Sequence, residues 1–200
     1  LQQCDESHLS LEFITREADG LILYNGPIVP PKADAPVLSD FIALELEQGF
    51  PRLLLDFGSG TLELKVKTKK TLDDGVWHRL DIFWDAESAR MVVDFCRTAE
   101  VYEADDGSAP EFDDNSCQAR GAIPPFAEAL NLNVPLQLGG LYRQHFDQSL
   151  YRWQYAFTSK GFDGCIRHLI HNSQHYDLAF PALARNSYPS CPQTDEMCLK

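Results

Sequence analysis

Three histidines late in the chain could ligate a metal ion: His168, His171 and His175. A zinc site needs three or more ligands that converge on one point. Strand alternation sends His168 and His171 to opposite faces, and a turn at Asn172-Ser173 separates His175 from both. We therefore expect surface histidines on a hairpin rather than a zinc site.

Four aspartates in the middle of the chain could supply the paired carboxylates of a hydrolase: Asp105, Asp106, Asp113 and Asp114. They lie in an acidic, irregular stretch, residues 98–121, which favours a solvated surface loop. A Gly-x-Ser-x-Gly nucleophile motif is absent, and the His, Ser and Asp residues follow no recognisable triad pattern. The sequence therefore predicts a protein that is not an enzyme.

The charge balance argues against polyanions as partners. The chain has 17 Lys and Arg residues against 30 Asp and Glu residues, which gives a formal net charge of -13. Binding to nucleic acid or to heparin needs clustered basic side chains. The only basic cluster is Lys65, Lys67, Lys69 and Lys70, and strand alternation places the first two on a solvated strand face. We expect no nucleic-acid or heparin binding, whereas an acidic surface suits divalent cations.

Six cysteines are spread along the chain without the CxxC spacing of a zinc site. This number favours disulfides and an extracellular location. Cys96 and Cys117 lie at the two ends of the acidic stretch and could close it as a loop. Six cysteines allow fifteen pairings, so the remaining connectivity stays open. No apolar run could span a membrane and no signal peptide is recognisable, so we expect a mature piece or a fragment.

Alternating apolar side chains predict the strands that must position these residues. Leu62, Leu64 and Val66 face one way, and the charged residues between them face the other. The same period occurs in residues 9–13 and 42–46, and short turns rich in glycine or proline follow these strands. A meander of half-buried antiparallel strands is the unit of an all-β sandwich.

Several short motifs occur in the order in which one known family has them. They are Ser10-Leu11-Glu12-Phe13 followed by Asp19-Gly20-Leu21-Ile22-Leu23-Tyr24, then Asp40-Phe41-Ile42-Ala43-Leu44-Glu45-Leu46, Leu55-Asp56-Phe57-Gly58-Ser59-Gly60, Asp74-Gly75-Val76-Trp77-His78, Leu138-Gly139-Gly140 and Gly161-Phe162-Asp163-Gly164-Cys165-Ile166. Through these motifs, residues 9–191 resemble laminin G-like domains. They look most like the laminin G modules in the ectodomains of non-chordate neural or epithelial cadherins.

The resemblance implies a fold and a function. The implied fold is all-β, a curved two-sheet antiparallel jelly-roll sandwich of the laminin G-like or concanavalin-like type, with one domain over residues 1–191. The implied function is that of a non-enzymatic extracellular module of a cell-surface cadherin-type receptor. Such a module would contact other modules of the same ectodomain or another adhesion receptor in calcium-dependent cell-cell adhesion. It would meet the membrane only through the longer parent chain.

The resemblance also implies a disulfide between Cys165 and Cys191, which would clamp the last strands to the body. Cys4 and Cys198 then remain, and two arrangements stay open for them. They could pair with each other, or Cys198 could belong to an EGF-like module whose first residues form the tail 192–200.

A calcium ion is the cofactor that the resemblance implies, bound at the rim of the sandwich. The matching side chains are Asp40 and Asn131, with Asn133 as the alternate, and Phe57 and Ala129 would supply main-chain carbonyls. Hard oxygen ligands with open water positions suit calcium. The alternative for Asp40 is a turn residue that caps its own backbone.

A second function follows from the same resemblance, because some laminin G-like domains hold a steroid between their sheets. A small hydrophobic ligand would need an internal cavity lined by residues such as Phe57, Leu64 and Phe83. A filled core would exclude this function. Binding to extracellular matrix or to another receptor is a further alternative of the same kind.

Overall fold

The computed structural model describes residues 6–28, 39–102, 111–125, 130, 132, 134–142, 147–151 and 153–189. Its strands are β1 (Ser7–Thr15), β2 (Gly20–Asn25), β3 (Phe41–Glu47), β4 (Phe50–Asp56), β5 (Thr61–Lys65), β6 (His78–Trp84), β7 (Ser88–Val93), β8 (Glu100–Tyr102), β9 (Glu111–Asp113), β10 (Gln118–Ala122), β11 (Gln137–Leu138), β12 (Gly164–His171) and β13 (Gln174–His175). Single turns of 3-10 helix are η1 (Asp94–Cys96), η2 (Asp114–Ser116) and η3 (Gln148–Leu150). Among the residues described, no helix combines the length and apolar character that crossing a bilayer requires.

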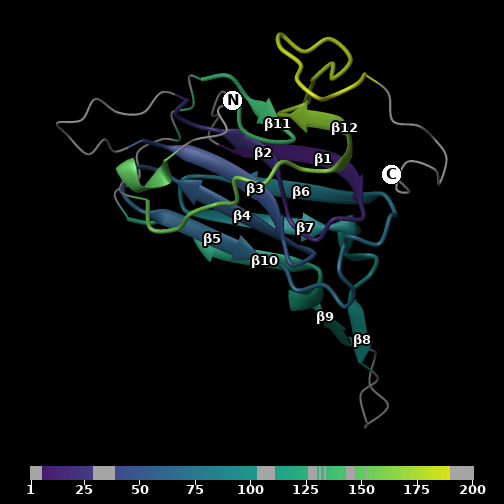
Figure 1. Cartoon of the computed structure of the whole chain (residues 1–200). Coiled ribbons are helices and arrows are strands. Elements are labelled where there is room, and N and C mark those ends of the chain that lie inside the picture. The colour runs from purple at the N-terminus through teal and green to yellow at the C-terminus, as the bar shows by residue number, and fades with distance from the viewer. Residues whose placement is uncertain are drawn as a thin grey trace.

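Two antiparallel sheets stack face to face (Figure 1). One sheet has the strand order β10-β7-β6-β1-β12-β13, and the other has the order β11-β2-β3-β4-β5. The hairpin β8-β9 pairs only with itself among the described strands and projects away from the sandwich (Figure 1). The predicted all-β, two-sheet antiparallel fold is therefore confirmed.

The main core lies between the two sheets and is built from the alternating residues of each strand. Leu9, Leu11 and Phe13 of β1 are almost fully buried there, as their period predicted. Leu64 and Val66 are buried in the same core, and Leu62 packs against its margin. The alternation of these strands was thus a reliable guide to which side chains face inward.

The prediction that the strands are half-buried is wrong for β3 and β4, whose outer faces are also covered. A second cluster, called here the outer cluster, packs on the side of this sheet that faces away from the main core. It consists of Leu21, Tyr24, Phe41, Ala43, Leu54 and Phe157, all buried. The cover is a crossing segment, residues 153–161, which brings Phe157 and Trp153 onto the sheet. The crossing segment is far from β3 in the sequence, so the periodicity of β3 could not identify it as the cover.

Candidate functional site

The rim of the five-stranded sheet lies where β3 begins and β4 ends. In the β3–β4 ladder Phe41 pairs with Asp56, so the same register carries Asp40 to a position beside Phe57. Two of the residues predicted to hold calcium, Asp40 and Phe57, therefore come together. Asn131, Asn133 and Ala129 lie outside the described residues.

The turn next to this rim is fixed by Asp56. Its carboxylate accepts a hydrogen bond from the Gly58 N–H at 2.8 Å and another from the Thr61 hydroxyl. Gly58 and Gly60 have φ values of 76° and 150°, which suit glycine, and the Phe57 N–H donates to the Gly60 carbonyl at 3.4 Å. Asp56 therefore acts as a structural cap that holds the main chain on both sides of Phe57.

The crossing segment fastens the same rim from outside. The Trp153 Nε1–H donates to the Ser39 carbonyl at 2.8 Å, directly before Asp40, and the Gln154 N–H donates to the Thr61 hydroxyl at 3.2 Å. At its other end the Leu21 N–H donates to the Lys160 carbonyl at 2.9 Å. Segments more than ninety residues apart in the chain are thus tied across one sheet face.

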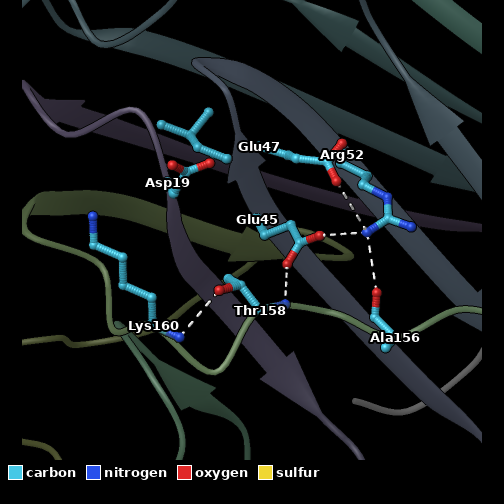
Figure 2. Close-up of a pocket in the computed structure, with 8 residues that line it drawn as sticks. Asp19, Glu45, Glu47, Arg52, Ala156, Thr158 and Lys160 are labelled. Atoms are coloured by element: carbon cyan, nitrogen blue, oxygen red, sulfur yellow. Dashed lines mark hydrogen bonds and ion pairs between the residues drawn. The ribbon is translucent and has the colours of Figure 1, made fainter.

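A buried ion pair anchors the middle of the crossing segment and lies in a surface pocket of about 420 Å³ (Figure 2). The guanidinium of Arg52 donates to Glu45 at 2.8 Å, to Glu63 at 2.5 Å and to the Ala156 carbonyl at 3.1 Å. The other oxygen of Glu45 accepts from the Thr158 N–H at 2.5 Å. β3 and β4 therefore hold the crossing segment through both its N–H and its C=O groups.

The charged groups of this pocket are tightly bonded to one another. Burial raises the pKa of Glu45 despite its bonds to Thr158 and Arg52. Burial opposes the charge of Arg52, but the hydrogen bonds that it donates to Glu45 and Glu63 outweigh burial and raise the pKa of the guanidinium. Glu47 is engaged as well, by Lys65. Both oxygens of Glu45 accept from protein donors, so this carboxylate holds the crossing segment against β3.

A second charged group centres on His78, which sequence reasoning missed. Its Nδ1 lies 2.7 Å from Asp94 and its Nε2 lies 3.0 Å from Asp74. Burial lowers the pKa of His78, but the hydrogen bonds to Asp94 and Asp74 outweigh this effect and raise it overall. The His78 ring therefore joins the turn before β6 to η1.

His168 and His171 lie on opposite faces of β12, as strand alternation predicted. His168 has a side chain 60% exposed, whereas His171 is 4% exposed and stacks on Trp84, so the opposite faces are confirmed. The prediction of surface histidines is wrong for His171, because its side of β12 faces the main core. Across the described ranges, no three His, Cys, Asp or Glu side chains gather as a metal site.

The cysteines divide between described and undescribed parts of the chain. Cys96 and Cys117 form a disulfide at the base of the β8-β9 hairpin, the pair suggested by their position at the ends of the loop. Cys165 is buried and also disulfide-bonded. Cys4, Cys191 and Cys198 lie outside the described residues, so the pairing of Cys165 with Cys191 stays a prediction.

The remaining sequence candidates take structural or surface positions. Lys65 pairs with Glu47, and Lys69 lies 3.5 Å from Glu100, so these lysines serve local ion pairs. Asp113 caps η2 by accepting from Asn115. Asp105 and Asp106 lie outside the described residues.

The three side chains considered for a steroid cavity do not line one space. Phe57 and Leu64 are buried in the main core. Phe83 lies on the outer face of the six-stranded sheet, where it stacks on His8 with 4.3 Å between ring centroids. Phe83 alternates with the buried residues of β6, which is the physical reason that it faces outward.

One sequence signal indicates that a further segment covers the outer face of β3 and β4. The runs Phe41-Ile42-Ala43-Leu44 and Leu53-Leu54-Leu55 are apolar on both faces, which is typical of a strand that is covered on both sides. Nothing local identified the covering residues, because Ala156 and Thr158 lie 104 and 113 residues from their partners.

Known proteins that resemble the chain agree on its family. The model of the laminin G domain family matches residues 13–174. The chain is 84% identical over all of its 200 residues to putative neural-cadherin 2 of Drosophila melanogaster, and 73% identical over 198 residues, 99% of the chain, to neural-cadherin of the same organism. It spans only 11% and 6% of these two relatives. It is 31% identical over 94% of its length to cadherin-related hmr-1 of Caenorhabditis elegans, of which it spans 6%.

Solved structures support the fold. Domains LG4-5 of the mouse laminin alpha1 chain match 93% of the chain with a TM-score of 0.60 and 23% identity, and the match covers 41% of that structure. The LG1-3 region of the laminin alpha2 chain matches 88% of the chain with a TM-score of 0.59 and 20% identity, and the match covers 29% of that structure. At these identities the likeness concerns the jelly-roll sandwich alone.

Proposed function

The chain belongs to the laminin G domain family, and from this premise we propose that it is a non-enzymatic extracellular module of a cadherin-type adhesion receptor. The observation that supports the proposal most is the 84% identity to putative neural-cadherin 2 along the whole chain. Because the chain spans 11% of that relative, adhesion is proposed for the longer protein, with this module as one part of it. The module would lie at the cell surface and reach the membrane through its parent chain.

The geometry suits a rigid spacer that offers its rim and sheet edges to protein partners. Two sheets pack on one main core, and the crossing segment adds a second apolar layer fixed by a buried ion pair. Partners of this kind are other modules of the same ectodomain or another adhesion receptor. The net charge of -13 disfavours nucleic acid and heparin.

We further propose that the rim binds calcium. Asp40 and Asn131, with Asn133 as the alternate, would supply side-chain oxygens, and Phe57 and Ala129 would supply carbonyls. The β3–β4 register supports this set, because it carries Asp40 to a position beside Phe57. The bonds of Ser39, Asp56 and Thr61 hold that rim in one geometry, which reduces the ordering cost of binding an ion.

Isothermal calorimetry tests the calcium site on three proteins. We expect heat of binding with the wild type and none with Asp40→Ala. The control Asp85→Ala changes a half-buried turn aspartate that accepts from the Glu87 and Ser88 N–H groups, and it should bind calcium like the wild type. Equal heats for the wild type and Asp40→Ala would refute the site.

Cell aggregation tests the receptor role. Cells that display the full-length receptor should aggregate in calcium, and removing this module from the receptor should weaken aggregation at equal surface levels. Unchanged aggregation without the module would refute its part in adhesion, whether or not the rim binds calcium.

A further inference from the structure

Within the described part of the chain, β10 is the edge strand of the six-stranded sheet. β10 pairs with β7 and with no other described strand, and it lies on the same side of the sandwich as β5 (Figure 1). An edge strand presents main-chain N–H and C=O groups to which another extended chain can bond. The register of the β10–β7 ladder shows which groups these are.

The outward groups belong to the even-numbered residues of β10. The Val93 N–H donates to the Cys117 carbonyl, and the Ile123 N–H donates to the Glu87 carbonyl, each at 2.8 Å. Hydrogen-bonded and non-bonded pairs alternate along an antiparallel ladder, so the odd-numbered residues of β10 bond to β7. Gln118, Arg120 and Ala122 therefore direct their N–H and C=O groups away from β7.

The same three residues place their side chains on the outer face of the sheet. Ala119 packs against the main core, and a Cβ on Gly121 would lie 2.6 Å from Leu62, so the odd-numbered residues face inward. Arg120 is exposed and stands directly opposite Arg90 of β7, which is exposed too. Like charges directly opposite each other destabilise a sheet.

Arg90 and Arg120 differ from their neighbours in making no ion-pair contact with a carboxylate among the described residues; the charge of Arg120 acts on Asp85 only at longer range, where it helps to lower the pKa of that carboxyl. On the same face Arg79 bonds Asp81 at 2.8 Å. Arg167 of β12 bonds Glu12 at 2.7 Å. Arg90 instead lies over the Phe83 ring at 4.8 Å, and Arg120 reaches only the Ser88 hydroxyl at 3.4 Å. Two cations side by side without an ion-pair contact, next to main-chain groups that no described strand bonds, break the pattern of the fold, as functional sites often do.

We propose that the edge of β10 binds an extended acidic segment of a partner protein, which adds to the sheet as a further strand. Its main chain would bond to Gln118, Arg120 and Ala122, and its carboxylates would pair with Arg120 and Arg90. Side chains two residues apart share a face of a strand, so the segment would carry Asp or Glu at alternating positions. The inference rests on the proposed role in protein contacts and names the chemistry of one partner.

The test uses a ten-residue peptide of alternating Glu and Thr with blocked ends, titrated into the ¹⁵N-labelled chain at physiological salt. We expect the amides of Gln118, Arg120 and Ala122 to shift and to become protected from exchange, and those of Ala119 and Gly121 to change less. A peptide with Gln in place of Glu, and one with N-methylated amides on its bonding side, should each bind at least about tenfold more weakly.

Charge-reversal variants distinguish binding of the Glu peptide at the β10 edge from general electrostatic attraction of the peptide to the protein. Arg120→Glu should weaken the Glu peptide at least about tenfold. The control Arg185→Glu makes the same charge change at an exposed arginine away from β10, which lies over the Tyr142 ring. This control should change the affinity for the Glu peptide by less than about twofold. Both side chains are exposed, so both variants should fold, which circular dichroism checks.

Four results would overturn the proposal. If the Gln peptide bound as tightly as the Glu peptide, the carboxylates would not be what β10 recognises. If the amide shifts centred on other residues, the peptide would not bind at the β10 edge. No peptide binding, together with aggregation of Arg120→Thr, would make Arg120 a guard against edge pairing. Self-association of the chain in sedimentation that Arg120→Glu abolishes would make a second copy the occupant. None of these results bears on calcium at the rim or on aggregation by the full receptor, so this failure is distinct from failure of the proposed function.

Discussion

Removing the guanidinium of Arg52 should cost far more stability than its place near the surface suggests. Arg52 is 9% exposed and its partner Glu45 is 2% exposed. In Arg52→Ala the Glu45 carboxylate would stay buried with the Thr158 N–H as its remaining donor. Breaking a buried pair from one side costs about 3–5 kcal/mol. That is a large share of the roughly 5–15 kcal/mol by which a folded domain is stable.

Replacing both partners should cost less than replacing one. In the double variant Glu45→Leu with Arg52→Met neither charge of the pair remains buried. The added loss is the bond of the Thr158 N–H, about 1–3 kcal/mol, because the bond to the Ala156 carbonyl is lost in Arg52→Ala as well. The control Lys160→Ala breaks the exposed ion pair with Glu17, which lies at 3.0 Å, and should cost less than about 1 kcal/mol.

Urea unfolding followed by two signals measures these costs. Circular dichroism reports the sheets, and tryptophan fluorescence includes Trp153, which lies in the crossing segment against Phe41. In Arg52→Ala we expect the fluorescence transition to come at lower urea than that of the sheets, because the crossing segment loses its central anchor. A cost below about 1 kcal/mol for Arg52→Ala, or a double variant less stable than the single one, would refute the clamp.

The remaining predictions concern pH and the disulfide. Since the pKa of His78 is raised above its ordinary value of 6.5, its stabilising effect should be complete below pH 6.5 and should fade as the pH rises through the raised pKa. His78→Gln should flatten that slope in unfolding measured from pH 6 upward, and an unchanged slope would contradict the assignment. Burial lowers the pKa of His171 to about 4, so its effect should be lost as the pH falls from 6.5 toward 4, and His171→Asn should remove that loss. Cys96→Ser with Cys117→Ser opens a loop of sequence separation 21 and should cost about 3 kcal/mol in urea unfolding without changing the sheets in circular dichroism, whereas an unchanged midpoint would refute a stabilising role.

The sequence predicted the fold because each inner face repeats with the period of a strand. Leu9, Leu11 and Phe13 carry that period without interruption, and their burial follows from it. The family resemblance suggested Asp40 and Phe57 as calcium ligands, and the β3–β4 register carries the two residues to neighbouring positions, whereas the calcium ion itself stays a prediction. The crossing segment could not be predicted in this way, because residues 153–161 have no strand period and lie over β3 only through tertiary contacts.

The crossing segment also determines which surfaces remain for partners. It covers the outer face of the five-stranded sheet with Phe157 and Trp153, so that face cannot take an added layer without losing this one. The outer face of the six-stranded sheet carries arginines and half-buried aromatic side chains, and the outward main-chain groups of its β10 edge, next to Arg90 and Arg120, are bonded by no described strand. Arginine and aromatic side chains are the residues that protein interfaces favour. A partner that does not bind at the rim should therefore approach from the β10 side. Substitutions on the covered face of the five-stranded sheet should lower the stability of the domain more than they change its affinity for a partner.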